Sequence, residues 1–210
     1  MARWIPFSLL LVCVFTTPLW NQSQGTDKYA VYGQNVENRA STRLGYWFKN
    51  VNAGLGEVVV SYGRPVWKPQ YAGQLDQLTK GRIWRMGNNY WTLLDTNLPV
   101  TIGGVSVAEG LYYLAVKRSA DGRQWELVFI DHDKSRDRQL DAFDVGTRPA
   151  EIPVLFSAPL SFEMTEGEPV DPLTILLKLD GGSNTRGSMR LTWGNLSLTA
   201  PVEVTLPEGF

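Results

Sequence analysis

Hydrophobic and polar residues alternate along much of the chain. The segment EVVVSYG, residues 57–63, places Val58, Val60 and Tyr62 on one side of an extended chain. Because successive side chains of a strand point to opposite faces, a period of two predicts strands with one buried face. The same period recurs in four later segments, residues 159–168, 173–180, 188–194 and 202–207.

Turn residues separate these segments. The pair Gly103–Gly104 lies between two short β-prone runs, which predicts a hairpin. The pair Asp121–Gly122 predicts a tight turn that joins residues 111–117 to residues 124–131. The second of these segments contains WELVFI, which is apolar on both faces and therefore suits a central strand.

Helical periodicity is scarce, and its best candidate is a short turn of helix within residues 74–84, QLDQLTKGRIW. Many short strands, together with 20 glycines and 12 prolines, favour an all-β antiparallel β-sandwich, with a barrel-like arrangement as the alternative. Residues 131–150 are the most polar and predict a long excursion between the two halves. No repeat or linker divides the chain, so we expect a single β-sandwich domain over residues 26–210.

The first residues predict a secretory signal peptide. Arg3 precedes an apolar run, Trp4–Phe15, and a polar region with small residues follows, so we expect cleavage after about Gly25. A membrane anchor is the alternative, but the run is shorter than the roughly 20 residues that a spanning helix needs, and Pro6 interrupts it. The expected location is therefore outside the cytoplasm, periplasmic or extracellular.

The amino-acid composition limits which partners the protein can bind and which catalytic or metal-binding groups it can use. The net charge is −1, which gives no basic surface for nucleic acid or an anionic membrane. Cys13, the only cysteine, lies in the signal segment, so the mature chain would have no disulfide, thiol nucleophile or cysteine-ligated metal. No later apolar run is long enough to span a bilayer, so we expect no transmembrane segment in the mature chain.

No catalytic, metal or cofactor set emerges from the titratable residues. The only histidine, His132, lies between two aspartates and could act as a base or a ligand, although a solvated position at a strand end is the simpler interpretation. Asp131, Asp133, Ser135 and Asp137 occupy every second position, which is the ligand spacing of a calcium loop. That pattern fails at Arg136, where glycine is needed, and at Ala142, where a glutamate belongs.

The segment GRIWRMGNNYW, residues 81–91, combines arginines, aromatic residues and asparagines. These side chains supply the bidentate donors, stacking faces and amides that bind a polar or anionic ligand. The candidate ligand-binding residues are Tyr62, Arg64, Trp84, Arg85, Asn88 and Asn89. A structural alternative stays open, in which Ile83 and Trp84 bury on a sheet and Gly87–Asn88 turns the chain through positive φ.

Five motifs in this order, SYGRP, GRIWRMGNN, VTIGGVSVAEGLYYL, WELVFI and LTWGN, resemble a bacterial family of exported proteins known as domain of unknown function 2911. The resemblance covers about residues 45–205. The family's glutamate after its G-A-N triplet falls on Tyr90 here, and the following small residue falls on Trp91. The resemblance implies export and a β-rich fold, and it implies no activity.

The favoured hypothesis is an exported, non-catalytic binding module for a polar or anionic small molecule or a glycan. One alternative is a hydrolase of envelope glycans whose paired carboxylates the sequence does not identify. The other is a structural domain whose sheet face meets an envelope protein.

Overall fold

The computed structural model describes residues 38–49 and 52–207. The predicted signal peptide lies outside these residues and stays a prediction. Within the described residues, no helix is long and apolar enough to cross a membrane.

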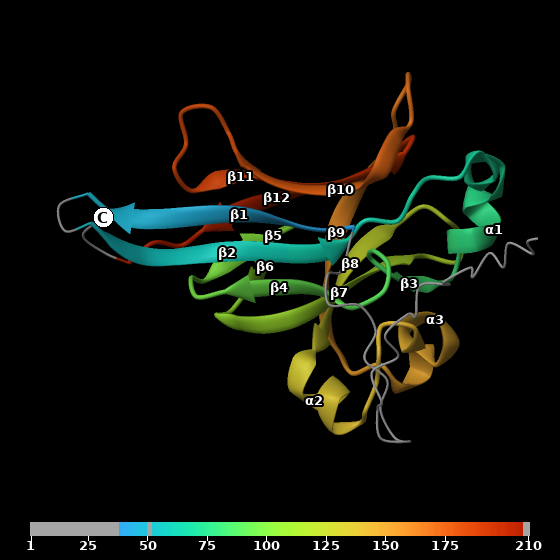
Figure 1. Ribbon diagram of the computed structural model, residues 1–210, viewed down its shortest axis with the longest axis horizontal. Helices are drawn as coiled ribbons and strands as arrows, with labels where there is room; N and C mark the ends of the chain where they lie inside the picture. The colour runs from blue at the N-terminus through green and yellow to red at the C-terminus, as the bar shows by residue number, and fades with distance from the viewer. Residues whose placement is uncertain (1–37, 50–51, 208–210) are drawn as a thin grey trace, which may run out of the picture. The chain divides into compact units, whose positions relative to one another are not determined.

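The described residues form twelve strands, and all pairings between these strands are antiparallel (Figure 1). The strands are β1 Arg39–Phe48, β2 Ala53–Gly63, β3 Ile83–Arg85, β4 Thr92–Thr96, β5 Val100–Ile102, β6 Val105–Val107, β7 Gly110–Arg118, β8 Trp125–Asp131, β9 Val154–Met164, β10 Val170–Leu179, β11 Arg186–Gly194 and β12 Leu196–Val204. The helices are short: α1 Leu75–Thr79, α2 His132–Asp137 and α3 Asp144–Thr147, with 3-10 turns η1 Pro69–Gln74 and η2 Pro149–Glu151.

The strands follow the order β1-β2-β4-β7-β8-β9-β12-β11-β10, with β3 added beside β7 and the β5–β6 hairpin beside β12. Strand β9 belongs to both layers, because its first part pairs with β8 and its last residues, 161–164, pair with β12. One layer therefore runs from β1 to β8 and the other from β12 to β10. The all-β antiparallel prediction is confirmed.

The strand order begins with β1 and ends with β10. Within the described strands, these two edges are joined by hydrogen bonds that involve side chains and not by regular strand pairing. The Leu177 amide of β10 donates to the Thr42 hydroxyl of β1 at 2.9 Å, and the Tyr62 hydroxyl of the adjacent strand β2 donates to the Ile175 carbonyl of β10 at 3.1 Å. The two layers thus meet along this seam without closing into a barrel.

The predicted alternation places the core correctly. Val58, Val60 and Tyr62 are buried between the layers, where they pack with the inward residues of every other long strand. The apolar WELVFI segment is the central strand β8, flanked by β7 and β9. Its Phe129 belongs to the main core and its Val128 to a second core on the opposite face, which explains why both faces are apolar.

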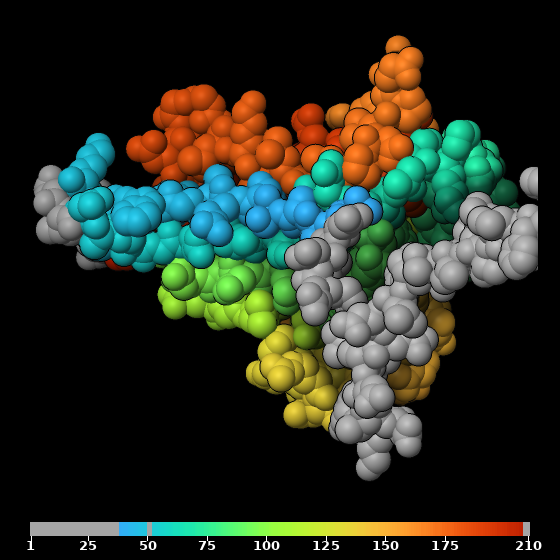
Figure 2. All heavy atoms as spheres, in the orientation of Figure 1, coloured from blue at the N-terminus to red at the C-terminus, as the bar shows by residue number. Residues whose placement is uncertain are grey.

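The second core lies where the polar segment 131–150 folds back over the outer face of β7 and β8. It contains Tyr113, Ala115, Val128, Ile130, Leu140, Val145 and Ile152. The excursion was predicted, but α2 and α3 were not, because helices this short do not show a helical period. Figure 2 shows α2, in yellow, at the surface beside the green strands. The short helix predicted within residues 74–84 is confirmed as α1.

Candidate functional site

The segment 81–91 is two structures: a short strand and a loop. Strands β3 and β4 lie end to end along one edge of β7, with Arg85 opposite Ala115 and Thr92 opposite Leu114. Residues 86–91 leave this line as a loop, which we call the 86–91 loop. The Thr92 hydroxyl donates to the Met86 carbonyl and closes the neck of the loop.

Glycines allow the loop to rest directly on β2. Gly87 has φ 130°, and a Cβ there would lie 2.9 Å from the Gly63 carbonyl oxygen. Asn89 adopts φ 62°, in the left-handed region that asparagine tolerates. The structural alternative for this segment, a turn through positive φ at Gly87–Asn88, is correct for Gly87, but the second positive φ belongs to Asn89 and not to Asn88.

Two of the predicted site residues, Trp84 and Tyr62, face the main core. Trp84 and Arg85 are neighbours in β3, so their side chains point to opposite faces of the sheet. The Trp84 ring packs inward, with its centroid 6.3 Å from that of Trp193. Tyr62 is buried, and its hydroxyl is used at the seam between the layers. These two residues therefore contribute to packing, on the far side of the sheet from Arg85.

Arg64 also lies apart from Arg85. Its Nε donates to the Leu173 carbonyl of β10 at 3.4 Å, so the guanidinium spans the seam. The nearby aromatic rings contact one another: Trp67 and Tyr71 both pack on Trp193, with centroids 5.1 and 5.2 Å away. These contacts do not bring all six predicted residues into a single pocket.

Arg85 lies at the outer face of the sheet, and Asn88 and Asn89 follow it in the 86–91 loop, where Asn88 is partly buried and Asn89 is exposed. The Arg85 guanidinium carbon lies 3.9 Å from the centroid of the Phe143 ring, just before α3. Within the described part of the chain Arg85 has no ion pair, and its buried NH1 has no acceptor. Burial lowers the pKa of Arg85, and the charge of Asp141 opposes this shift.

Arg39 is a second guanidinium at this loop, and the sequence did not indicate it. Its NH2 donates to the Ser61 hydroxyl at 3.1 Å and to the Trp91 carbonyl, the last residue of the loop, at 3.2 Å. Its NH1 is buried without an acceptor among residues 38–49 and 52–207, and burial lowers its pKa while Tyr90 opposes the shift. Only the register that sets Arg39 opposite Gly63 brings it here, and no local pattern predicts that register.

The loop also offers an unused acceptor. The Asn88 side-chain oxygen is buried and receives no hydrogen bond from the described residues. At the end of the 86–91 loop, the Trp91 ring stacks on the Tyr113 ring, with centroids 4.3 Å apart and an angle of 3° between the ring planes. Two unsatisfied guanidinium nitrogens and one unsatisfied amide oxygen can bind an anion that also carries a donor such as a hydroxyl.

The acidic residues of the excursion serve the local fold. The Asp131 side chain accepts from the Lys134 amide at 2.9 Å and so caps α2, which lowers the pKa of Asp131. His132 begins this helix with only 16% of its side chain exposed, so its packing against Tyr113 replaces the solvated position that the sequence suggested. Within the described ranges, no group of three or more histidine, cysteine or acidic residues could hold a metal.

In the described residues, every carboxylate with a shifted pKa has its pKa lowered. The pKa values of Asp76, Asp121, Asp131 and Asp144 are all lowered, chiefly by hydrogen bonds that their carboxylates accept. Such environments stabilise the ionised form, which suits structural caps and ion pairs.

Comparison with known proteins gives a match to a family. A family model described as protein of unknown function (DUF2911) matches residues 48–202. No curated protein and no solved structure matches the chain.

Proposed function

Since the chain belongs to the DUF2911 family, proteins of unknown function, we propose a function from its own residues: it binds a small polar anion at the 86–91 loop. The observation that carries this proposal is the pair of guanidiniums, Arg39 and Arg85, that border the loop without a carboxylate partner in the described residues. The binding is non-catalytic.

The energetic argument is that an unpaired, partly buried guanidinium is unfavourable. A buried donor without an acceptor loses its water and receives nothing in return, which costs roughly 1–3 kcal/mol. The lowered pKa of both arginines reflects the same loss of solvation. An anion bound between the loop and these side chains would supply the missing acceptors, and the Asn88 oxygen would accept from a hydroxyl of the same ligand.

A glycan hydrolase is less well supported. A glycosidase needs one carboxylic acid whose pKa is raised so that it can protonate the leaving group. Every shifted carboxylate within the described residues has a lowered pKa instead. The proposal also retains the predicted export, which rests on residues 1–25, so the ligand would be met in the periplasm or outside the cell.

Titration calorimetry with three probes, inorganic phosphate, citrate and a sugar phosphate, tests the proposal. We expect saturable binding of at least one probe, and a loss of about tenfold or more in affinity in Arg39→Ala and in Arg85→Ala. Arg85→Lys keeps the charge but loses the fork, so it should bind with intermediate affinity.

Arg190→Ala is the matched control, because Arg190 is exposed on β11, in the other layer. It should bind like the wild type. Since Arg85→Ala also removes the contact with Phe143, a Phe143→Ala variant separates packing from binding: it should be less stable yet still bind the anion. The proposal fails if none of the three probes binds, or if Arg190→Ala weakens binding as much as Arg85→Ala.

A further inference from the structure

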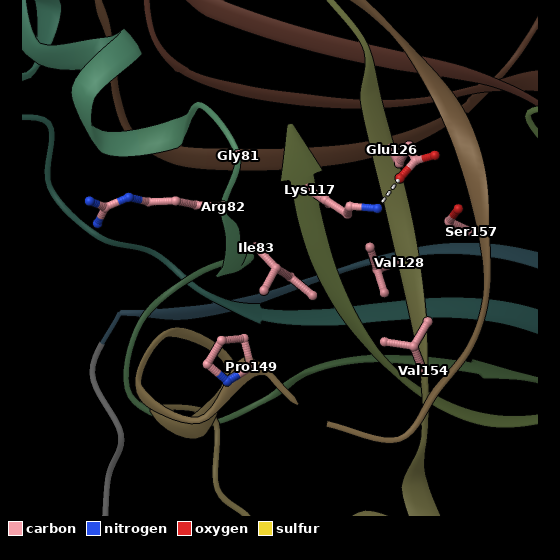
Figure 3. Close-up of a pocket in the computed structure, with 9 residues that line it drawn as sticks. All are labelled: Gly81, Arg82, Ile83, Lys117, Glu126, Val128, Pro149, Val154 and Ser157. Atoms are coloured by element: carbon pink, nitrogen blue, oxygen red, sulfur yellow. Dashed lines mark ion pairs between the residues drawn. The ribbon is translucent and has the colours of Figure 1, made fainter. Parts of the chain in front are cut away.

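A separate hollow lies on the outer face of the first layer, beside η2 (Figure 3). We propose that it binds the apolar body of a small monocarboxylate, with the ligand carboxylate at Lys117. This site goes beyond the anion site at the 86–91 loop and does not depend on it, because Ile83 of β3 lines the hollow while Arg85 packs against Phe143.

The floor of the hollow is apolar. Ile83, Val128 and Val154 come from three different strands, and Pro149 closes one side from η2. In Figure 3 these four side chains surround the same space. Val154 remains 50% exposed, so a ligand that covers it would remove apolar surface from water.

The rim of the hollow carries one ion pair. Lys117 and Glu126 face each other across β7 and β8, with Nζ 3.2 Å from Oε2, whereas the Arg82 side chain points away from Lys117 (Figure 3). The Lys117–Glu126 pair is open to solvent, with 55% and 34% of the two side chains exposed. Exposed pairs of this kind contribute little to stability, so a ligand carboxylate can replace Glu126 at Lys117.

Size sets the class of ligand. The hollow has a volume of about 380 Å³, near the lower end of the roughly 300–1,000 Å³ that small-molecule sites occupy. An apolar floor with the Lys117 ammonium at its rim complements an aliphatic or aromatic monocarboxylate. The Ser157 hydroxyl, on the β9 wall, can donate a hydrogen bond to the same carboxylate.

Octanoate is the probe, and amide NMR spectra of the whole protein are the readout. We expect saturable shifts centred on Ile83, Lys117, Val128 and Ser157, with acetate binding more than about tenfold more weakly because it lacks the methylenes. Octanamide should also bind more weakly, because it carries no charge.

Two substitutions should move the octanoate affinity in opposite directions. Lys117→Gln removes the cation and should weaken binding by about threefold, whereas Glu126→Gln removes the competing carboxylate and should strengthen binding by a similar factor. Arg43→Gln is the control, because Arg43 forms an exposed pair with Glu57 (3.1 Å) far along the same layer. It should leave the affinity unchanged.

Any of three results overturns the proposal: shifts that do not saturate or lie elsewhere, an unchanged affinity in Lys117→Gln, or a weaker affinity in Glu126→Gln. Failure of this proposal can be distinguished from failure of the anion site at the 86–91 loop. Arg85→Ala should still bind octanoate, and Lys117→Gln should still bind the anion probe found there.

Discussion

Gly63 of β2 and Asn88 of the 86–91 loop approach so closely that no side chain fits between them. A Cβ on Gly63 would lie 2.2 Å from the Asn88 carbonyl oxygen and 2.3 Å from its side-chain oxygen. The same glycine stands opposite Arg39 in the β1–β2 ladder. The contact therefore fixes the loop relative to one of the two guanidiniums that border it.

Gly63→Ala should displace the loop. The new methyl group would collide with backbone atoms, which cannot rotate away, so we expect a loss of about 2 kcal/mol in the free energy of unfolding, measured by urea denaturation. Gly54→Ala is the control, because Gly54 lies in the same strand with open space around its Cβ position; it should change stability by less than about 0.5 kcal/mol. A Gly63→Ala protein as stable as the wild type would show that the loop does not rest on β2 as described.

The sequence predicts what each strand buries, because that information is local. The alternation around Val58 and Val60 and the double-faced character of β8 follow from side chains that a single segment presents. Both predictions agree with the structure. The turn at Gly103–Gly104 is equally local, and it joins β5 to β6.

The candidate site depends on contacts between distant segments, which no local pattern reveals. Composition grouped Arg64, Trp84 and Arg85, yet the alternation within β3 alone places Trp84 and Arg85 on opposite faces. Arg64 meets its partner in β10, and Arg39 reaches the loop only through the β1–β2 register. Register is set by pairing across the sheet, so these neighbours appear only when the fold is known.

Arg118 joins α1 to the end of the first layer, and its removal should be costly. It is only 7% exposed. It donates to the Asp76 carboxylate at 2.7 Å, to the Thr79 hydroxyl at 3.0 Å and to the Gly122 carbonyl at 2.9 Å, and its guanidinium lies over the Trp125 ring. Arg118→Ala removes three hydrogen bonds, each worth about 1 kcal/mol, and the contact with Trp125, while Asp76 keeps its ion pair with Lys80. We therefore expect a loss of about 3 kcal/mol in the free energy of unfolding.

Arg123→Ala is the matched control for Arg118, since Arg123 is exposed beside the same turn. We expect it to stay within about 0.5 kcal/mol of the wild type. Hydrogen exchange should show, in addition, that the amides of α1 exchange faster in Arg118→Ala and not in Arg123→Ala. Equal stability of the two variants would contradict the role of Arg118 as the link.

The Asp144–Arg148 pair makes the region of α3 sensitive to acid. Arg148 holds the Asp144 carboxylate with both Nε and NH2, at 2.8 and 2.7 Å, and the Asp141 amide donates to the same carboxylate at 2.8 Å. The hydrogen bonds from Arg148, and then that from Asp141, lower the pKa of Asp144 from 3.8 to about 2. The helix they stabilise follows Phe143, which covers Arg85.

Because the pKa of Asp144 is lower in the folded protein than in the unfolded chain, the ionised carboxylate stabilises the fold above about pH 3.8, and this contribution disappears as the pH falls through about 2. Asp144→Asn lacks it at every pH. We therefore expect the stability difference between wild type and Asp144→Asn, measured by urea denaturation from pH 6 to about pH 2, to be constant above about pH 5 and to shrink toward acid. Other acidic residues titrate in both proteins and cancel in this difference. Arg148→Gln should give a difference with the same pH dependence, because it removes the other partner. A difference that stays constant down to pH 2, or that grows toward acid, would show that the Asp144 carboxylate is not held by Arg148 in solution.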